Sequence, residues 1–448
     1  MRADGQPEEA IRSFRSAYER LVGGEPAVLR SDELEPAGDV PSLDGLPEAD
    51  EAGALERVAC IKLNGGLATT MGLRSPKSLV EARDKHSFLE IIIGQTLSLR
   101  RRHGIRLPLV LMDSEATRKE TLAALERHPE LRDRLEPDFL QSMIPKLDAE
   151  HLSPVSWPPE PSLEWCPPGH GDVYGSLRAS GMLAALLERG IKHAMISNCD
   201  NLGATVDPRI AAYISSEQIP FLMEVVEGTE AERKGGHIAR RRTDDQQLVL
   251  RETAQTPLED QESFRDFRRW RYYNTNNLWI DLRTLAETLD RRDGVLELPL
   301  IVNRKTVDPR DPDSPQVLQL ESAMGAAIES FPGARVLCVP RTRFVPVKTT
   351  DDLLVMRSDV YRLTDRMTVE PRPERAARLP YVELDKRYYR LLDQFEERFP
   401  DGPPSLREAE RLVVRGDVTF AAGVVVRGAV ELDAKQPRRL EPGTVLSG

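Results

Sequence analysis

This sequence lacks any apolar run near the roughly 20 residues that a helix needs to cross a bilayer, so we expect no contact with a membrane. Residues 1–9 contain no apolar stretch of the secretory kind, and we expect the protein in the cytoplasm. Only four cysteines occur, without a C-x-x-C pair, which excludes a disulfide scaffold and a zinc site of that pattern. The net charge of -11 disfavours nucleic-acid binding, which needs a cationic surface. A site for an anionic substrate must therefore be locally basic.

The chain of 448 residues is too long for one ordinary core, and its texture divides it into three segments. Residues 1–55 begin with Ile11, Phe14, Tyr18 and Leu21 at helical spacing, which predicts one amphipathic helix that ends at a glycine pair. The rest of this segment is rich in proline, glycine and acidic residues without periodicity, as in a linker or strap.

After residue 56, short apolar runs alternate with helical patterns. Strand-like runs occupy residues 58–61, 109–112, 194–196 and 221–223. Ser87 and Glu90 form a capping box that predicts a helix, which Gly104 ends. A further helix is predicted over residues 176–190. Strands and helices in alternation indicate a mostly parallel sheet covered on both faces, and such sheets bind ligands at the carboxyl ends of their strands.

The C-terminal region has a different pattern. Residues 412–418 (LVVRGDV) nearly repeat as residues 424–430 (VVVRGAV), an offset of twelve residues. Val418, Val424 and Val430 are six residues apart, a spacing that suits the rungs of a parallel β-helix with a turn at each glycine. Two copies are a small sample, so a β-meander remains an alternative interpretation of the same residues.

A glycine-rich loop follows the first strand of the sheet. The strand ends at Leu63 and continues into residues 64–78 (NGGLATTMGLRSPKS). Gly65 and Gly66 allow the backbone to approach phosphate oxygens closely, and Lys77 can neutralise phosphate charge. The pattern by itself is only moderately specific, because many such turns are plain connections.

Two familiar nucleotide motifs are absent from this loop. A P-loop ending at Lys77 would need glycine at Met71 and at Pro76, and neither position is glycine. The dinucleotide fingerprint G-x-G-x-x-G is also missing. The loop therefore predicts a nucleotide site of another type.

Six ordered blocks carry a resemblance that covers almost the whole chain from about residue 57. They are residues 63–67 with 76–78 (LNGGL and PKS), 167–174 (PPGHGDVY), 198–204 (NCDNLGA), 274–279 (NTNNLW), 319–327 (QLESAMGAA) and 343–350 (RFVPVKTT). Together they resemble the UTP:glucose-1-phosphate uridylyltransferase family, also called UDP-glucose pyrophosphorylases, of the type best known from eukaryotes.

The resemblance implies an α/β fold with a Rossmann-like nucleotidyltransferase core, a mixed and mostly parallel sheet, and a C-terminal left-handed parallel β-helix. The catalytic domain would span residues 56–365, and a helical connection with the β-helix would span residues 366–448. The implied partners are UTP and glucose-1-phosphate, with Mg²⁺ as the cofactor. We expect a monomer or dimer, with the β-helix as the surface for any self-association.

The resemblance also implies roles for single residues. Asp200 would bind the Mg²⁺ ion that bridges the two phosphorylated substrates, although by residue type it fits a turn cap as well. Lys348 and Lys77 would be the catalytic cations. By residue type Lys348 also fits an ordinary surface lysine. The implied nucleotide-binding set is Leu63, Asn64, Gly65, Gly66, Lys77, Gln141, Gly169, Asp200 and Lys348, and the implied sugar-phosphate set is His170, Asn198, Glu252 and Asn276.

The loop departs from the family pattern in two places. Ala68 replaces a third glycine, and the pair at Arg74 and Ser75 replaces Lys-Gly, so the affinity for UTP can differ. Two alternatives to the glucose enzyme also remain. One is a related pyrophosphorylase for N-acetylglucosamine-1-phosphate or for several sugar-1-phosphates, and the other is an inactive scaffold that assembles through its β-helix.

Overall fold

The computed structural model describes residues 1–24, 28–48, 50–67, 71–72, 75–232, 235–243, 246–375 and 378–448. Ala68 and Arg74, two of the residues at which the glycine-rich loop departs from the family pattern, lie outside these described ranges. Within them, no helix is both long enough and apolar enough to span a membrane.

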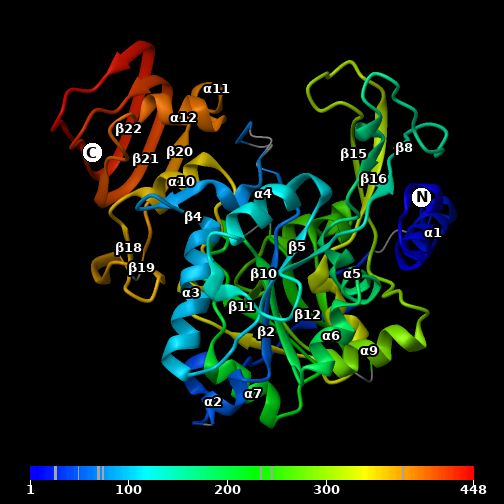
Figure 1. The fold of residues 1–448 in the computed structure, drawn as a ribbon. Helices are drawn as coiled ribbons and strands as arrows, with labels where there is room; N and C mark the ends of the chain where they lie inside the picture. The colour runs from blue at the N-terminus through cyan, green and yellow to red at the C-terminus, as the bar shows by residue number, and fades with distance from the viewer. Residues whose placement is uncertain are drawn as a thin grey trace.

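A central sheet of ten strands forms the core of the described chain (Figure 1). Its strands are β1 Leu34–Pro36, β2 Val58–Leu63, β5 Leu109–Asp113, β6 Asp138–Leu140, β10 His193–Asn198, β11 Phe221–Glu227, β12 His237–Arg241, β13 Leu248–Arg251, β14 Tyr272–Asp281 and β17 Arg335–Cys338. The run β10-β2-β5-β6 is parallel throughout, and β11 pairs in parallel with β17. Strands β1, β13 and β14 run against the others, so the sheet is mixed but mostly parallel, as the alternating pattern predicted.

The four strand-like runs of the sequence lie in strands β2, β5, β10 and β11. Strand β2 is buried on both faces. Val58 and Cys60 pack in a cluster with side chains of α2 Glu51–Leu55 and α7 Pro208–Ser216. Ala59 and Ile61 face the opposite cluster, which contains side chains of α5 Val173–Ala179, α6 Met182–Glu188 and α9 Leu282–Arg291. This alternation places helices on both faces, because successive side chains of a strand point to opposite sides.

The capping box at Ser87 predicted its helix accurately. Helix α3 spans Phe88–His103, Ser87 and Glu90 bond reciprocally, and Gly104 ends the helix with a left-handed φ of 66°. The helix predicted over 176–190 is wrong in its extent. Two short helices, α5 Val173–Ala179 and α6 Met182–Glu188, replace it, because Gly181 adopts φ 79° and interrupts the helical backbone.

The other α-helices lie around the central sheet and the smaller sheets. They are α1 Glu8–Gly23, α4 Glu115–Leu125, α8 Gln261–Phe264, α9 Leu282–Arg291, α10 Thr350–Arg357, α11 Lys386–Tyr389 and α12 Leu392–Arg398. Helix α1 is the predicted amphipathic helix, and it lies beside the three-stranded sheet of β8 Leu147–Asp148, β15 Ile301–Thr306 and β16 Gln316–Glu321 (Figure 1). The strap that follows α1 contributes β1, which pairs with β12 in the central sheet.

The C-terminal strands form an all-parallel sheet on the side of the molecule opposite α1 (Figure 1). The strands are β20 Tyr381–Leu384, β21 Ser405–Thr419, β22 Val425–Arg439 and β23 Val445–Ser447. Their parallel pairing excludes the β-meander, whose neighbours would be antiparallel. The twelve-residue repeat does not set the stacking, because Leu412 pairs with Val430.

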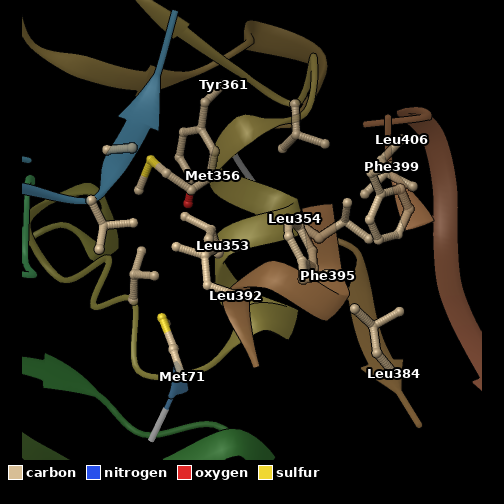
Figure 2. Close-up of a cluster of buried hydrophobic side chains, with 14 of the residues drawn as sticks. Met71, Leu353, Leu354, Met356, Tyr361, Leu384, Leu392, Phe395, Phe399 and Leu406 are labelled. Carbon is tan, nitrogen blue, oxygen red and sulfur yellow. The ribbon is translucent and has the colours of Figure 1, made fainter. Parts of the chain in front are cut away.

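One hydrophobic cluster joins the C-terminal strands to the rest of the chain. Figure 2 shows Met71 of the glycine-rich loop close to the same group of side chains as Leu353 of α10 and Leu392 of α12. Phe395 and Phe399, also on or next to α12, have ring centroids 4.8 Å apart. The C-terminal region therefore shares a core with the loop that carries the candidate nucleotide site.

Candidate active site

A cavity of about 250 Å³ lies at the carboxyl ends of β2 and β10. Ten of the thirteen candidate residues identified from the sequence are part of the cavity lining. The lining is completed by Ser78, Met112, Pro167 and Cys199. Those ten are Leu63, Asn64, Gly65, Gly66, Lys77, Gln141, Gly169, His170, Asn198 and Asp200. Glu252, Asn276 and Lys348 are not part of this lining. The parallel strands explain the convergence, because their ends meet at one edge of the sheet.

The glycine-rich loop closes on itself at the cavity. Leu67 forms an isolated bridge with Pro76, and the Lys77 N–H donates to the Gly66 carbonyl over 3.3 Å. Lys77 is thereby brought beside the glycines although it lies eleven residues further along the chain. A β-carbon on Gly65 would lie 2.5 Å from Gln141 Oε1, so only glycine lets that amide lie against the loop.

The Asn64 side chain points away from the cavity and into the core. Its Nδ2 donates to Asp113 Oδ1 over 2.7 Å and to Thr121 Oγ1 over 2.9 Å. The side chain is buried, so Asn64 offers a ligand its main chain only. These bonds fix the start of the loop to the end of β5 and to α4.

Asp200 follows β10 and forms an ion pair with Lys77. The Lys77 ammonium donates to Asp200 Oδ2 over 2.8 Å. Asp200 Oδ1 is buried without a hydrogen-bond partner among the described residues. A buried carboxylate oxygen without a donor fits a hard cation such as Mg²⁺, which prefers oxygen ligands. No group of three or more His, Cys, Asp or Glu side chains suited to a metal occurs in the described part of the chain, so phosphate oxygens would have to supply the other ligands.

His170 lies on a loop that packs against the main chain of Ser322. A β-carbon on Gly169, whose φ is 79°, would lie 2.5 Å from the Ser322 carbonyl oxygen. The Met324 N–H donates to His170 Nδ1 over 2.9 Å, so a neutral His170 carries its proton on Nε2. Burial, and then the charge of Lys348, lower the pKa of His170 to about 4. His170 is therefore a neutral hydrogen-bond donor at pH 7.

Lys348 begins the turn before α10 and is exposed. Its charge lowers the pKa of both His170 and Glu252. Burial dominates at Glu252 and raises the pKa of that carboxyl to about 7. Glu252 packs against Gly236, where a β-carbon would lie 2.4 Å from Glu252 Oε1.

Asn276 lies at a bulge of β14 and has a left-handed φ of 57°. The Asn274 side chain stabilises this conformation, because its Nδ2 donates to Asn276 Oδ1 and its Oδ1 accepts the Asn276 N–H over 2.8 Å. Strands β10 and β14 pair from His193 with Asp281 to Ile196 with Leu278. Asn198 and Asn276 each lie two residues beyond the last of these pairs. Bulges recur next to active sites, where they redirect a side chain.

Sequence reasoning missed the residues that hold the site in shape. Ser322 and Met324 belong to the block at 319–327, yet only their contacts with the His170 loop reveal a role. Asn274 belongs to the block at 274–279 and supports Asn276. The only signal in the sequence was that these residues lie in blocks of the family pattern.

Comparisons with known proteins show which family this chain resembles over most of its length. The model of the UTP--glucose-1-phosphate uridylyltransferase family matches residues 11–427. The uridylyltransferase of Musa acuminata is 36% identical over 442 residues, which are 97% of this chain and 92% of that protein. The enzyme of Saccharomyces cerevisiae is 38% identical over 377 residues, which are 84% of this chain and 74% of that protein.

Solved structures of the same kind of enzyme are also similar to this chain over its whole length. A variant of the Leishmania major UDP-glucose pyrophosphorylase, crystallised with UDP-glucose, is 40% identical and has a TM-score of 0.93, with coverage of 100% of this chain and 96% of that chain. A Trypanosoma brucei structure described as UDP-glucose phosphorylase matches with the same identity, TM-score and coverage. This chain belongs to the UTP--glucose-1-phosphate uridylyltransferase family.

Proposed function

We propose that this protein transfers a uridylyl group from UTP to glucose-1-phosphate and releases UDP-glucose and pyrophosphate. The observation that carries the proposal is the Lys77 and Asp200 pair in a glycine-lined cavity at the carboxyl end of a parallel sheet. Membership of the uridylyltransferase family supports the identity of both substrates.

The reaction brings together two anions that repel each other. An oxygen of the sugar phosphate attacks the α-phosphorus of UTP in line, and the bond from that phosphorus to the bridging oxygen breaks. The electron pair leaves with pyrophosphate. The attacking oxygen is already ionised, so the protein mainly has to position the reactants and neutralise charge.

Several main-chain and side-chain groups of the candidate site would share this task. The main chain of Gly65 and Gly66 would approach the phosphates of UTP, and the Gln141 amide would pair with the uracil edge as both donor and acceptor. Lys77 would stabilise the leaving pyrophosphate. His170 would donate its Nε2–H to the sugar phosphate, and Lys348 would stabilise the charge of the transition state.

Asp200 would hold Mg²⁺ through the carboxylate oxygen that has no described partner. When bound, the ion would neutralise and orient the phosphates of both substrates. Asn198, Glu252 and Asn276 would accept or donate hydrogen bonds at the glucose hydroxyls. A pyrophosphorylase for other sugar-1-phosphates is the second candidate, and the block that contains Asn276 favours glucose.

A coupled assay for UDP-glucose tests the proposal. We expect product from UTP and glucose-1-phosphate only with Mg²⁺, and less product from N-acetylglucosamine-1-phosphate. Lys348→Ala and Asp200→Asn should each lower kcat by about 100-fold or more, the usual effect of removing an electrostatic group from such a site. Arg366→Ala, on an exposed turn, is the control and should act like wild type. A Lys348→Ala rate within tenfold of wild type would refute the assigned role.

We propose further that strands β20 to β23 form a left-handed β-helix in a C-terminal unit of residues 366–448, after an N-terminal helix and acidic strap at 1–55 and a catalytic unit at 56–365. Parallel pairing of Leu412 with Val430 and of Val425 with Val445 supports coils of similar length. A monomer or dimer, with any self-association through these strands, is the expected assembly. Four free cysteines fit a reducing compartment and support a cytoplasmic location.

A further inference from the structure

A buried ion pair lies outside the lining of the candidate active-site cavity. Glu224 of β11 is fully buried, and Arg343, in the turn before Lys348, is also buried. Arg343 donates from Nη2 to Glu224 Oε1 over 2.6 Å and from Nε to Oε2 over 2.7 Å. Trp279 Nε1 and Asn277 Nδ2 donate to the same carboxylate over 2.9 and 3.1 Å. Among the described residues, the hydrogen bonds to this carboxylate come from β14 and from Arg343.

The segment that begins at Arg343 is bonded to the turn that carries Asp200. Asn201 Nδ2 donates to the Arg343 carbonyl over 3.1 Å, and Asn201 Oδ1 accepts the Val345 N–H over 2.9 Å. The Val347 N–H donates to the Asp200 carbonyl over 3.1 Å. Hydrogen bonds thus connect Glu224, through Arg343 and Asn201, to the segment whose Val347 N–H bonds to the Asp200 carbonyl, and Lys348 follows Val347.

Close packing at a glycine supports the same connection. A β-carbon on Gly203 would lie only 2.3 Å from the Thr342 carbonyl oxygen. The two turns therefore meet at a distance that a larger residue would prevent. Arg343 Nη2 also donates to the Thr205 carbonyl over 2.8 Å, on the far side of the same turn.

We propose that Glu224 and Arg343 are positioning residues that set where Lys348 and Asp200 stand relative to each other, an inference that rests on the proposed function. A buried ion pair stabilises a fold little, because desolvation offsets the Coulomb attraction, and an apolar pair of similar volume often serves as well. A bidentate arginine–carboxylate pair does, however, fix the relative orientation of its two side chains. Electrostatic catalysis depends on groups held in place before the reaction, and a displacement of about 1 Å can lower the rate about 100-fold.

The test compares Glu224→Gln with wild type. The variant keeps the shape of the side chain, and Arg343 retains the Asp207 carboxylate at 3.8 Å and the Thr205 carbonyl, so a folded protein is expected. We expect kcat to fall about 30-fold or more at the temperature where the variant remains folded. The KM for UTP should stay within about threefold, because the Gly65 loop and Gln141 are untouched. Arg343→Lys, which keeps the charge but loses the bidentate geometry, should lie between Glu224→Gln and wild type.

A second ion pair provides the matched control. Arg398 of α12 and Asp417 of β21 form an ion pair of 2.8 Å in the C-terminal region. Asp417→Asn makes the same carboxylate-to-amide change and should lower the melting temperature without changing kcat. A loss of kcat that merely follows the loss of folded protein in both variants would show a structural role and overturn the inference.

The outcomes also separate this inference from the proposed function. If Lys348→Ala is impaired while a folded Glu224→Gln stays within threefold of wild type in kcat, the positioning role is wrong and the function stands. If wild type makes no UDP-glucose, the function itself is wrong. Should Glu224→Gln not fold, the same comparison with Arg343→Lys decides.

Discussion

Burial shifts two titratable side chains of the site in opposite directions. It lowers the pKa of His170 to about 4 and raises the pKa of Glu252 to about 7, because a poorly solvated environment disfavours the charged form of each. The ammonium of Lys348 assists the first shift and opposes the second. Near pH 7, His170 is thus neutral and Glu252 is about half protonated. These two shifts therefore reduce the number of charged side chains in the candidate site before the anionic substrates bind.

The shift at Glu252 predicts a dependence of stability on pH. Its pKa rises from an ordinary 4.5 to about 7 on folding, so the unfolded state loses this proton at lower pH than the folded state. Stability from this group is full below about pH 4.5 and is lost as the pH rises through about 7. Between pH 4.5 and 8.5, wild type should lose about 1–3 kcal/mol of unfolding free energy that Glu252→Gln does not lose.

Denaturant unfolding of both proteins across this pH range measures the difference. Glu287→Gln, a change at an exposed position of α9, is the control and should show the pH dependence of wild type. Parallel curves for wild type and Glu252→Gln would contradict the prediction.

At the scale of single elements, β14 contains a bulge that carries the candidate residue Asn276. Its bulge lies at Thr275 and Asn276, and Asn276 takes a backbone conformation that few residues other than glycine and asparagine adopt. Thr275 Oγ1 donates to the Glu224 carbonyl over 2.7 Å, which holds the bulge against β11. On both sides of the bulge, β14 pairs with β11 in regular antiparallel register.

The left-handed residue allows a comparison of two substitutions. Asn276→Gly and Asn276→Ala both remove the side-chain amide, so both should raise the KM for glucose-1-phosphate. Only alanine is strained at φ 57°, and Asn276→Ala should be less stable than Asn276→Gly by about 1–2 kcal/mol. Thermal unfolding and sugar-phosphate titration of both variants test this. Equal stability would show that the bulge relaxes when Asn274 loses its partner.

For the whole molecule, the shared core in Figure 2 couples the C-terminal region to the glycine-rich loop. Phe395 is buried at its centre, and a β-carbon on Gly72 would lie 2.8 Å from Leu391 Cδ2. The loop and the helices before β21 therefore pack directly. Because their apolar surfaces are shared, we expect the two regions to unfold together.

Phe395→Ala tests this coupling. Removal of the buried ring should lower the unfolding free energy by about 3–5 kcal/mol, and a single cooperative transition should move to lower temperature. Leu258→Ala, at a side chain that is 90% exposed, should change stability by less than about 0.5 kcal/mol. Calorimetry distinguishes the outcomes. Two separate transitions, with only one affected by Phe395→Ala, would show independent regions.

Local patterns in the sequence determined the elements that depend on neighbouring residues. The capping box at Ser87 predicted α3, the apolar run from Val58 predicted β2, and the glycines after Leu63 predicted the loop at the cavity. The parallel arrangement followed from alternating strands and helices. These features are readable because caps, turns and periodicity act over a few residues.

The tertiary structure decided the features that join distant residues. Glu224 and Arg343 are separated by 119 positions, and neither shows its partner in the sequence. The parallel pairing of Leu412 with Val430 depends on the turn between β21 and β22, and the twelve-residue repeat does not reveal it. Burial of His170 and Glu252 depends on what packs over them, so their shifted pKa values emerge only in the fold. Sequence patterns specify local conformation, whereas desolvation and long-range pairing arise when the chain is folded.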